Sequence, residues 1–123
     1  MPSNVTEVEF APDSAELTRL RDHTRQTLHQ WGLDGLASVA CLLVTELATN
    51  AIQHGRQPAR LRLVHGDLLR IEVTDTHPEP PTPREPDATG GHGLTVLSGL
   101  ADSWNVEHGQ DGQKTVWCEL LSP

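Results

Sequence analysis

A stretch in the middle of the chain carries three polar side chains at a spacing that suits chemistry. Glu46, Asn50 and His54 follow one another every four residues, so an α-helix places them along one edge. That edge borders an apolar stripe, and a polar side chain beside a core is costly unless a ligand, a pocket or a partner group satisfies it. Glu46 would supply a base, and the amide oxygen of Asn50 a hard ligand for Mg²⁺ beside phosphate oxygens and water. The alternative is structural: Glu46 supports the helix surface, and His54 the negative end of the helix dipole.

Two further positions could contact a nucleotide. Asp75 ends an apolar strand directly before a proline-rich segment. A carboxylate there can accept a hydrogen bond from an amino group such as that of adenine, although Asp is equally common in turns. The segment 90–94 reads Gly-Gly-His-Gly-Leu and opens a predicted helix. Glycines at a helix N-terminus let backbone N–H groups approach a phosphate, although they are also ordinary flexible residues.

The elements that must position these residues follow from periodicity. We predict a strand at 5–10, helices from about 13 to 31 and from 34 to 54, strands at 59–65 and 68–74, a helix at 93–102, and strands at 104–107 and 115–121. Between them, residues 76–92 form a long irregular loop. This order predicts an α+β fold, a two-layer α/β sandwich with helices on one face of a mixed, mostly antiparallel sheet. The length of 123 residues fits one domain over 1–123.

Local signals suggest where the first two helices begin and end. Asp13 with Glu16 is a candidate capping box, and Asp34 is a candidate cap for the second helix. Gly32 and Gly55 are candidate C-terminal glycines in the left-handed conformation. The inward side chains of the second helix and of the hairpin are predicted to be Leu36, Val39, Ala40, Leu43, Leu47, Leu61, Leu63, Leu69, Ile71 and Val73.

Composition excludes some classes of partner. The formal net charge is −8, with nine Lys and Arg against seventeen Asp and Glu. Nucleic acid and anionic membrane surfaces are therefore not expected partners, because both require a basic footprint. The N-terminus lacks a signal-peptide pattern and no long apolar run is evident, which predicts a cytoplasmic protein. Cys41 and Cys118 lie in apolar stretches and are expected to fill the core rather than to form a disulfide.

Taken together, the motifs resemble those of the GHKL ATPases, the superfamily of gyrase, Hsp90, histidine kinases and MutL. The segment from Glu46 to Gly55 is similar to the N box, and Asp75 matches the acid of the adenine-binding box. The segment 91–94 matches the second glycine box, and the closing segment around Thr115 matches the last strand. The small size and the Glu-x-x-x-Asn-Ala-x-x-His-Gly form are most similar to anti-sigma-factor serine kinases. The chain has Thr-His-Pro-Glu after Asp75, where the superfamily reads Asp-x-Gly-x-Gly.

The resemblance implies a role for each matching residue. Glu46 would be the general base, and Asn50 would coordinate Mg²⁺ that bridges the phosphates of ATP. Asp75 would read adenine, Thr115 would help to hold it through water, and His54 would shape the pocket. The phosphate-binding residues implied by the second glycine box are Gly91, Gly93 and Leu94, and residues 76–92 would be the ATP lid.

The resemblance also implies a function and partners. The chain would transfer the γ-phosphate of ATP to a serine of a STAS-type antagonist and would regulate a sigma factor by binding it. The resemblance also allows a homodimer. The alternative is a non-catalytic protein-binding module with a degenerate nucleotide pocket, favoured by the altered segment after Asp75. A histidine kinase catalytic domain is a third hypothesis, but no helix pair with a phospho-accepting histidine precedes the domain in this sequence.

Overall fold

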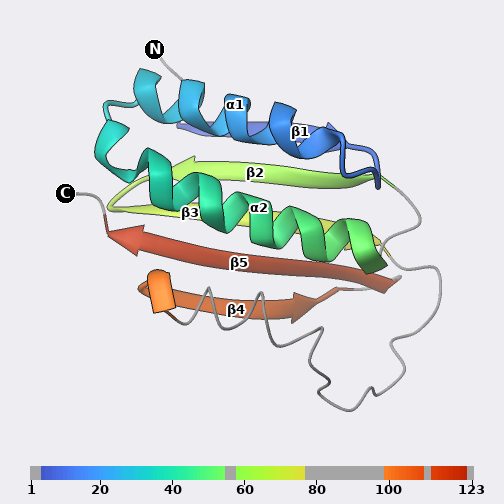
Figure 1. Ribbon diagram of the computed structural model, residues 1–123. Helices are drawn as coiled ribbons and strands as arrows, with labels where there is room; N and C mark the ends of the chain where they lie inside the picture. Colours follow the sequence, from blue (N-terminus) through green and yellow to red (C-terminus); the bar gives the residue numbers. More distant parts are fainter. Residues whose placement is uncertain (1–3, 55–57, 77–98, 110–111, 122–123) are drawn as a thin grey trace.

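The computed structural model describes residues 4–54, 58–76, 99–109 and 112–121, which form five strands and one layer of helices (Figure 1). The elements are β1 (Val5–Phe10), α1 (Glu16–Gln30), a 3₁₀ turn η1 (Asp34–Leu36), α2 (Ala37–His54), β2 (Ala59–His65), β3 (Leu68–Thr76), β4 (Ser103–His108) and β5 (Gln113–Leu121). The predicted strand 68–74 extends as β3 to Thr76, which was predicted to begin the loop. The rest of that loop, 77–92, and most of the predicted helix 93–102 fall outside the described residues. Of that helix, residues 99–102 are described: 99 and 100 are helical, whereas 101 and 102 are not, so the helix ends two residues earlier than predicted.

The strands form one sheet in the order β1-β2-β3-β5-β4, and each neighbouring pair is antiparallel. The strand predicted at 5–10 is therefore confirmed, and it lies at one edge of the sheet. The hairpin of β2 and β3 is also confirmed, with Leu61 opposite Val73 and Leu63 opposite Ile71. Helices α1 and α2 lie on the same face of this sheet (Figure 1). The predicted α+β two-layer sandwich is confirmed.

The core lies between this helical layer and the sheet. The five inward side chains predicted for the hairpin are all at most 2% exposed, so each contributes about 1.5–3 kcal/mol of burial free energy. On α2 the buried stripe is wider than predicted, because Val44, Ala48 and Ala51 join Ala40, Leu43 and Leu47. Leu36 and Val39 lie at its margin and are only partly buried. A helix with so broad an apolar face must lie flat on the sheet, which fixes its remaining polar edge.

The start of α1 differs from the predicted capping box. The helix begins at Glu16 after Ala15, and no side chain caps it. Asp13 instead accepts a hydrogen bond from the backbone N–H of Ala15 at 2.9 Å, and Glu16 accepts one from the N–H of Ala11 at 3.0 Å. Both carboxylates therefore stabilise the turn between β1 and α1 instead of capping the helix. The predicted end is confirmed, because Gly32 has a φ of 73° and follows the last turn of the helix.

The start of α2 also differs from the prediction. Asp34 does not cap the helix with its side chain; it opens the 3₁₀ turn η1, and the α-helix begins at Ala37. The carboxylate of Asp34 is instead hydrogen-bonded to His29 Nδ1 at 2.9 Å. This contact ties the end of α1 to the entry of α2. The predicted C-terminal glycine, Gly55, lies outside the described residues.

By length and composition alone, α2 also meets the criterion for a membrane-spanning helix. The stretch Asp34–Gln53 has a mean hydropathy of 1.6 over its most apolar window, so the expectation that the chain has no long apolar run is wrong. In the structure its apolar side chains belong to the core cluster against the sheet. Such a helix is also what the centre of a two-layer sandwich requires, so the criterion by itself is weak evidence for a membrane.

Both cysteines are buried free thiols, as predicted. Cys118 lies on β5 among the inward residues, and burial raises the pKa of its thiol to about 12. Burial also raises the pKa of the Cys41 thiol, on α2. Since the thiolate is the reactive form, both side chains act as core residues.

Candidate functional site

The polar edge of α2 carries Glu46 and Asn50, one helical turn apart. Both side chains are half-buried, and their neighbours Leu43, Leu47 and Ala51 are buried. The helix therefore holds a carboxylate and an amide at the margin of the core, as its periodicity predicts. The backbone of His54 belongs to the last turn of α2, but its side chain lies outside the described part of the structure. Among the described residues, no three His, Cys, Asp or Glu side chains gather as a metal site.

Asp75 is the buried acid of the sheet. It follows Leu69, Ile71 and Val73 in the alternation of β3, so its side chain lies on the face that the helices cover. It is 2% exposed, and its Oδ1 is the buried side-chain oxygen that has no hydrogen-bond partner among the described residues. Leaving such an acceptor unpaired costs about 1–3 kcal/mol, more when the group is charged. This arrangement suits a carboxylate that accepts a hydrogen bond from a ligand.

Lys114 is the residue that the structure adds to this site. It lies directly opposite Asp75 in the pairing of β3 with β5, and its Nζ lies 3.8 Å from Asp75 Oδ2. At this separation the two groups form an ion pair without a hydrogen bond. The sequence motifs do not single out Lys114, although the sequence contains a signal for it. Every second residue of β5 faces inward, namely Val116, Cys118 and Leu120. The same alternation predicts that residue 114, two positions before Val116, also faces inward.

Thr115, which the resemblance assigned to the adenine site, lies on the other face of the sheet. Its hydroxyl is hydrogen-bonded to that of Thr74 at 2.8 Å, and these two residues are paired across β3 and β5. Because neighbouring residues of a strand point to opposite faces, the side chain of Thr115 is separated from that of Asp75 by the sheet. The structure therefore brings Lys114, and not Thr115, to the buried acid.

The charged groups on this open face of the sheet satisfy one another, which distinguishes them from Asp75. Arg70 Nε donates to Glu72 Oε2 at 2.6 Å, and Arg70 Nη1 lies 3.5 Å from Glu119 Oε2. The same guanidinium lies over the ring of Trp117, 4.1 Å from its centroid. This network is fully paired and needs no ligand. The contrast supports a ligand-binding role for Asp75, whose Oδ1 has no hydrogen-bond partner among the described residues.

Three segments meet at one end of the sandwich. The C-terminal end of α2, the C-terminal end of β3 and the start of β5 lie at the same end (Figure 1). Asp75 near the end of β3 and Lys114 near the start of β5 therefore lie at the same end of the sandwich as the C-terminal part of α2, to which Asn50 belongs. The residues expected to cradle phosphate, Gly91, Gly93 and Leu94, and the expected lid lie outside the described residues.

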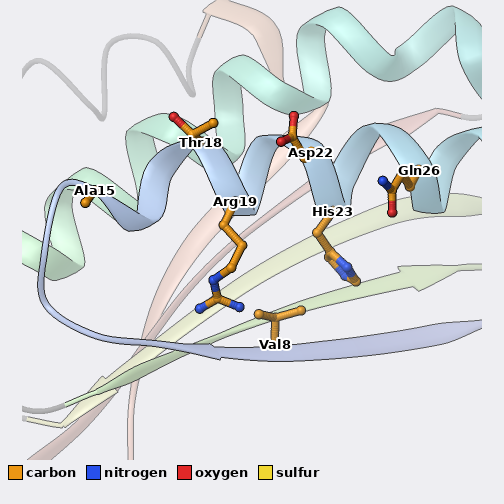
Figure 2. Close-up of a pocket in the computed structure, with 7 residues that line it drawn as sticks. All are labelled: Val8, Ala15, Thr18, Arg19, Asp22, His23 and Gln26. Atoms are coloured by element: carbon orange, nitrogen blue, oxygen red, sulfur yellow. The ribbon is translucent and has the colours of Figure 1, made fainter.

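A second, shallow pocket lies between α1 and β1. Figure 2 shows the side chains of Arg19 and His23 extending from α1 toward Val8 of β1. Arg19 is already engaged: it forms an ion pair with Glu16 at 2.6 Å and donates to the backbone carbonyl of Glu9 at 2.9 Å. His23 Nε2 is hydrogen-bonded to Thr6 Oγ1 at 3.1 Å. These contacts join the helix to the edge strand, and they give the pocket a structural role.

His23 is expected to make the stability of the fold depend on pH. Burial, and secondarily the charge of Arg19, lowers the pKa of His23 below 6.5. The native state thus binds the proton less tightly than the unfolded chain. The contribution of neutral His23 to stability is therefore complete above about pH 6.5 and is lost as the pH falls through the lower native pKa. We expect the thermal midpoint to fall less between pH 7.5 and pH 5 in His23→Gln than in the wild type.

The control for this experiment is His108→Gln, at an exposed position of β4. It should keep the pH dependence of the wild type. If His23→Gln lost as many degrees as the wild type over the same interval, the packing of His23 against β1 would not be the source of acid sensitivity.

Comparison with known proteins gives the family. The model of the histidine kinase-like ATPase domain matches residues 10–119. Among solved structures, the histidine kinase domain of the blue-light-activated histidine kinase EL346 from Erythrobacter litoralis matches with a TM-score of 0.52 and 21% identity, over 98% of this chain and 69% of that one. The cytoplasmic segment of histidine kinase QseC matches with a TM-score of 0.49 and 14% identity, over 98% and 80% of the two chains. A search of the curated proteins gives no match. Because the family match covers most of its length, this chain belongs to the histidine kinase-like ATPase domains of the GHKL superfamily.

Proposed function

We propose that this domain binds ATP with Mg²⁺ and transfers the γ-phosphate to a serine hydroxyl of a partner protein. The observation that carries the proposal is the buried Oδ1 of Asp75, which has no hydrogen-bond partner among the described residues and lies at the end of the sandwich where α2 also ends. A buried acceptor without a partner fits the exocyclic amino group of adenine, which is a donor. Membership of an ATP-binding superfamily supports the same ligand.

Each residue of the site has a distinct part in this proposal. Asp75 accepts a hydrogen bond from the adenine amino group. Asn50 would hold Mg²⁺ through its amide oxygen, and the ion would supply positive charge to the phosphates. Glu46, one turn earlier on α2, takes the proton from the attacking hydroxyl. Positioning and charge neutralisation supply most of the catalysis of phosphoryl transfer, so a small domain with few catalytic groups is sufficient.

The partners follow from the motif form rather than from the geometry. The acceptor serine would belong to a STAS-type antagonist protein in the cytoplasm, and the domain would also bind a sigma factor. The Glu-x-x-x-Asn-Ala-x-x-His-Gly form of α2 supports this assignment. Phosphorylation of the antagonist would then decide which of the two proteins the domain binds.

A second function is a protein-binding module without catalysis. The ion pair between Asp75 and Lys114 favours this second function, because the lysine ammonium competes with the amino group of adenine for the Asp75 carboxylate. The departure from Asp-x-Gly-x-Gly after Asp75 points the same way. Binding of the antagonist without nucleotide, and without any transfer of phosphate to it, would support this function.

Titration with ATP by isothermal calorimetry, with and without Mg²⁺, tests the proposed site. We expect saturable binding that strengthens with Mg²⁺, and loss of the Mg²⁺-dependent gain in Asn50→Ala because the amide ligand is removed. Gln53→Ala is a matched control, since Gln53 is an exposed amide on the same helix. No binding by the wild type at millimolar ATP would exclude the kinase and leave the protein-binding module.

A further inference from the structure

Lys114 and Asp75 place opposite charges on the covered face of the sheet, and none of the sequence motifs selects Lys114. Asp75 is 2% exposed and the side chain of Lys114 is 20% exposed, so both groups have lost most of their water. An ion pair of this kind stabilises a protein only when its geometry is good and the remaining donors and acceptors are satisfied. Here the closest atoms are 3.8 Å apart.

The ion pair leaves Asp75 incompletely bonded and contains no hydrogen bond. Asp75 Oδ1 has no hydrogen-bond partner among the described residues, and the ammonium of Lys114 carries three donors, of which none is within hydrogen-bond distance of Asp75. If the pair served stability alone, closer approach along the flexible lysine side chain would satisfy both groups. A ligand that carries a hydrogen-bond donor next to an acceptor would bond both residues at once, with its donor to Asp75 and its acceptor to Lys114.

We propose that Lys114 is a specificity-determining residue of the nucleotide pocket, which donates a hydrogen bond to the ring acceptor of the base while Asp75 accepts from the adjacent amino group. This inference rests on the proposed binding of ATP. Adenine presents an amino donor at C6 beside the acceptor N1. A carboxylate is an acceptor only and an ammonium a donor only, so the two side chains together match this edge. Neither side chain alone distinguishes adenine from another amine.

The alternation of side chains along β5 places Lys114 on the inward face, beside Asp75. Thr115 points to the open face and is bonded to Thr74, whereas Lys114 shares the inward face with Val116. The position that contacts the base edge therefore carries a cation instead of a hydroxyl. A direct, charge-assisted hydrogen bond to N1 is stronger than one from a neutral donor.

A chemical double-mutant cycle tests the contact. The probes are ATP and 1-deaza-ATP, which keeps the amino group but has a C–H in place of N1. Affinities are measured by calorimetry for the wild type, Lys114→Met and the control Arg60→Met, which removes one cation from an exposed position of β2. We expect the wild type and Arg60→Met to prefer ATP by roughly tenfold or more, the typical effect of a hydrogen bond to a charged group. In Lys114→Met this preference should be lost.

The outcomes separate this inference from the proposed function. If wild type and Lys114→Met bind ATP and prefer it over 1-deaza-ATP to the same extent, Lys114 does not read N1, and the ATP site stands without it. If the wild type binds neither nucleotide, both proposals are wrong. Should Lys114→Met not fold, the wild type still decides alone, because equal affinities for the two nucleotides would overturn the contact. Lys114→Arg, which keeps a charged donor, should retain a preference for ATP.

Discussion

Replacing Glu46 with Gln should slow phosphoryl transfer by about 10²- to 10⁴-fold and leave ATP affinity near that of the wild type. This range is the usual contribution of a positioned general base. The amide keeps the shape of the side chain and its place on the half-buried edge of α2, but it cannot take a proton from the attacking hydroxyl. The change therefore acts on the chemical step and not on the binding of the nucleotide.

Two assays measure this effect. Release of ADP from Mg²⁺-ATP reports transfer to water, and labelling of a STAS-type protein from ATP labelled in the γ-phosphate reports transfer to serine. Calorimetry checks that the variant still binds ATP. Glu9→Gln, which removes an exposed carboxylate of β1, is the matched control and should react at the rate of the wild type. A Glu46→Gln protein that transfers phosphate as fast as the wild type would show that this carboxylate is not the base.

Replacing Asp75 with Asn should weaken ATP binding by roughly 10- to 100-fold, the typical effect of removing a hydrogen bond to a charged group. The substitution changes one acceptor oxygen into an amino group that can only donate, and it removes the negative charge beside Lys114. The amino group of adenine would then face either a weaker acceptor or another donor. Because Asp75 is 2% exposed, water cannot replace the lost contact.

The measurement is again a calorimetric titration with ATP, accompanied by a thermal unfolding curve that confirms a folded variant. Asp67→Asn makes the same chemical change at an exposed position in the turn between β2 and β3, and it should bind ATP as the wild type does. Asp75→Asn with unchanged affinity would contradict the assignment of Asp75 to the base. The same result would also contradict the proposal that the pair of Asp75 and Lys114 binds the base.

The sequence by itself determined the elements and the family, because both depend on local pattern. Period-two alternation placed the hairpin and its buried side chains, such as Leu61 and Ile71, correctly. Helical periodicity placed Glu46 and Asn50 at the margin of the core, since four-residue spacing fixes their relation on any α-helix. The motifs also predicted the superfamily that the family match over residues 10–119 confirms. The anti-sigma-type function and partners stay predictions.

Helix starts were less well predicted, for a physical reason. Asp13, Glu16 and Asp34 are all residue types that favour a cap, but each carboxylate can bond several nearby donors. The packed structure gave Asp13 and Glu16 to the backbone of the turn before α1, and Asp34 to His29. Sequence spacing does not rank these competing partners, because their distances depend on how α1 meets β1 and η1.

The content of the buried site was decided by tertiary structure. A shift of one residue along a strand moves a side chain to the opposite face of the sheet. Motif resemblance selected Thr115, whereas the pairing of β3 with β5 places Lys114 beside Asp75 and Thr115 beside Thr74. Whether the Asp75 carboxylate finds a partner also depends on β5, a strand that is distant in the sequence and places Lys114 opposite it. The sequence named the acid, and only the packing of the sheet against the helices showed that it is buried, paired with a lysine and left with one acceptor unused.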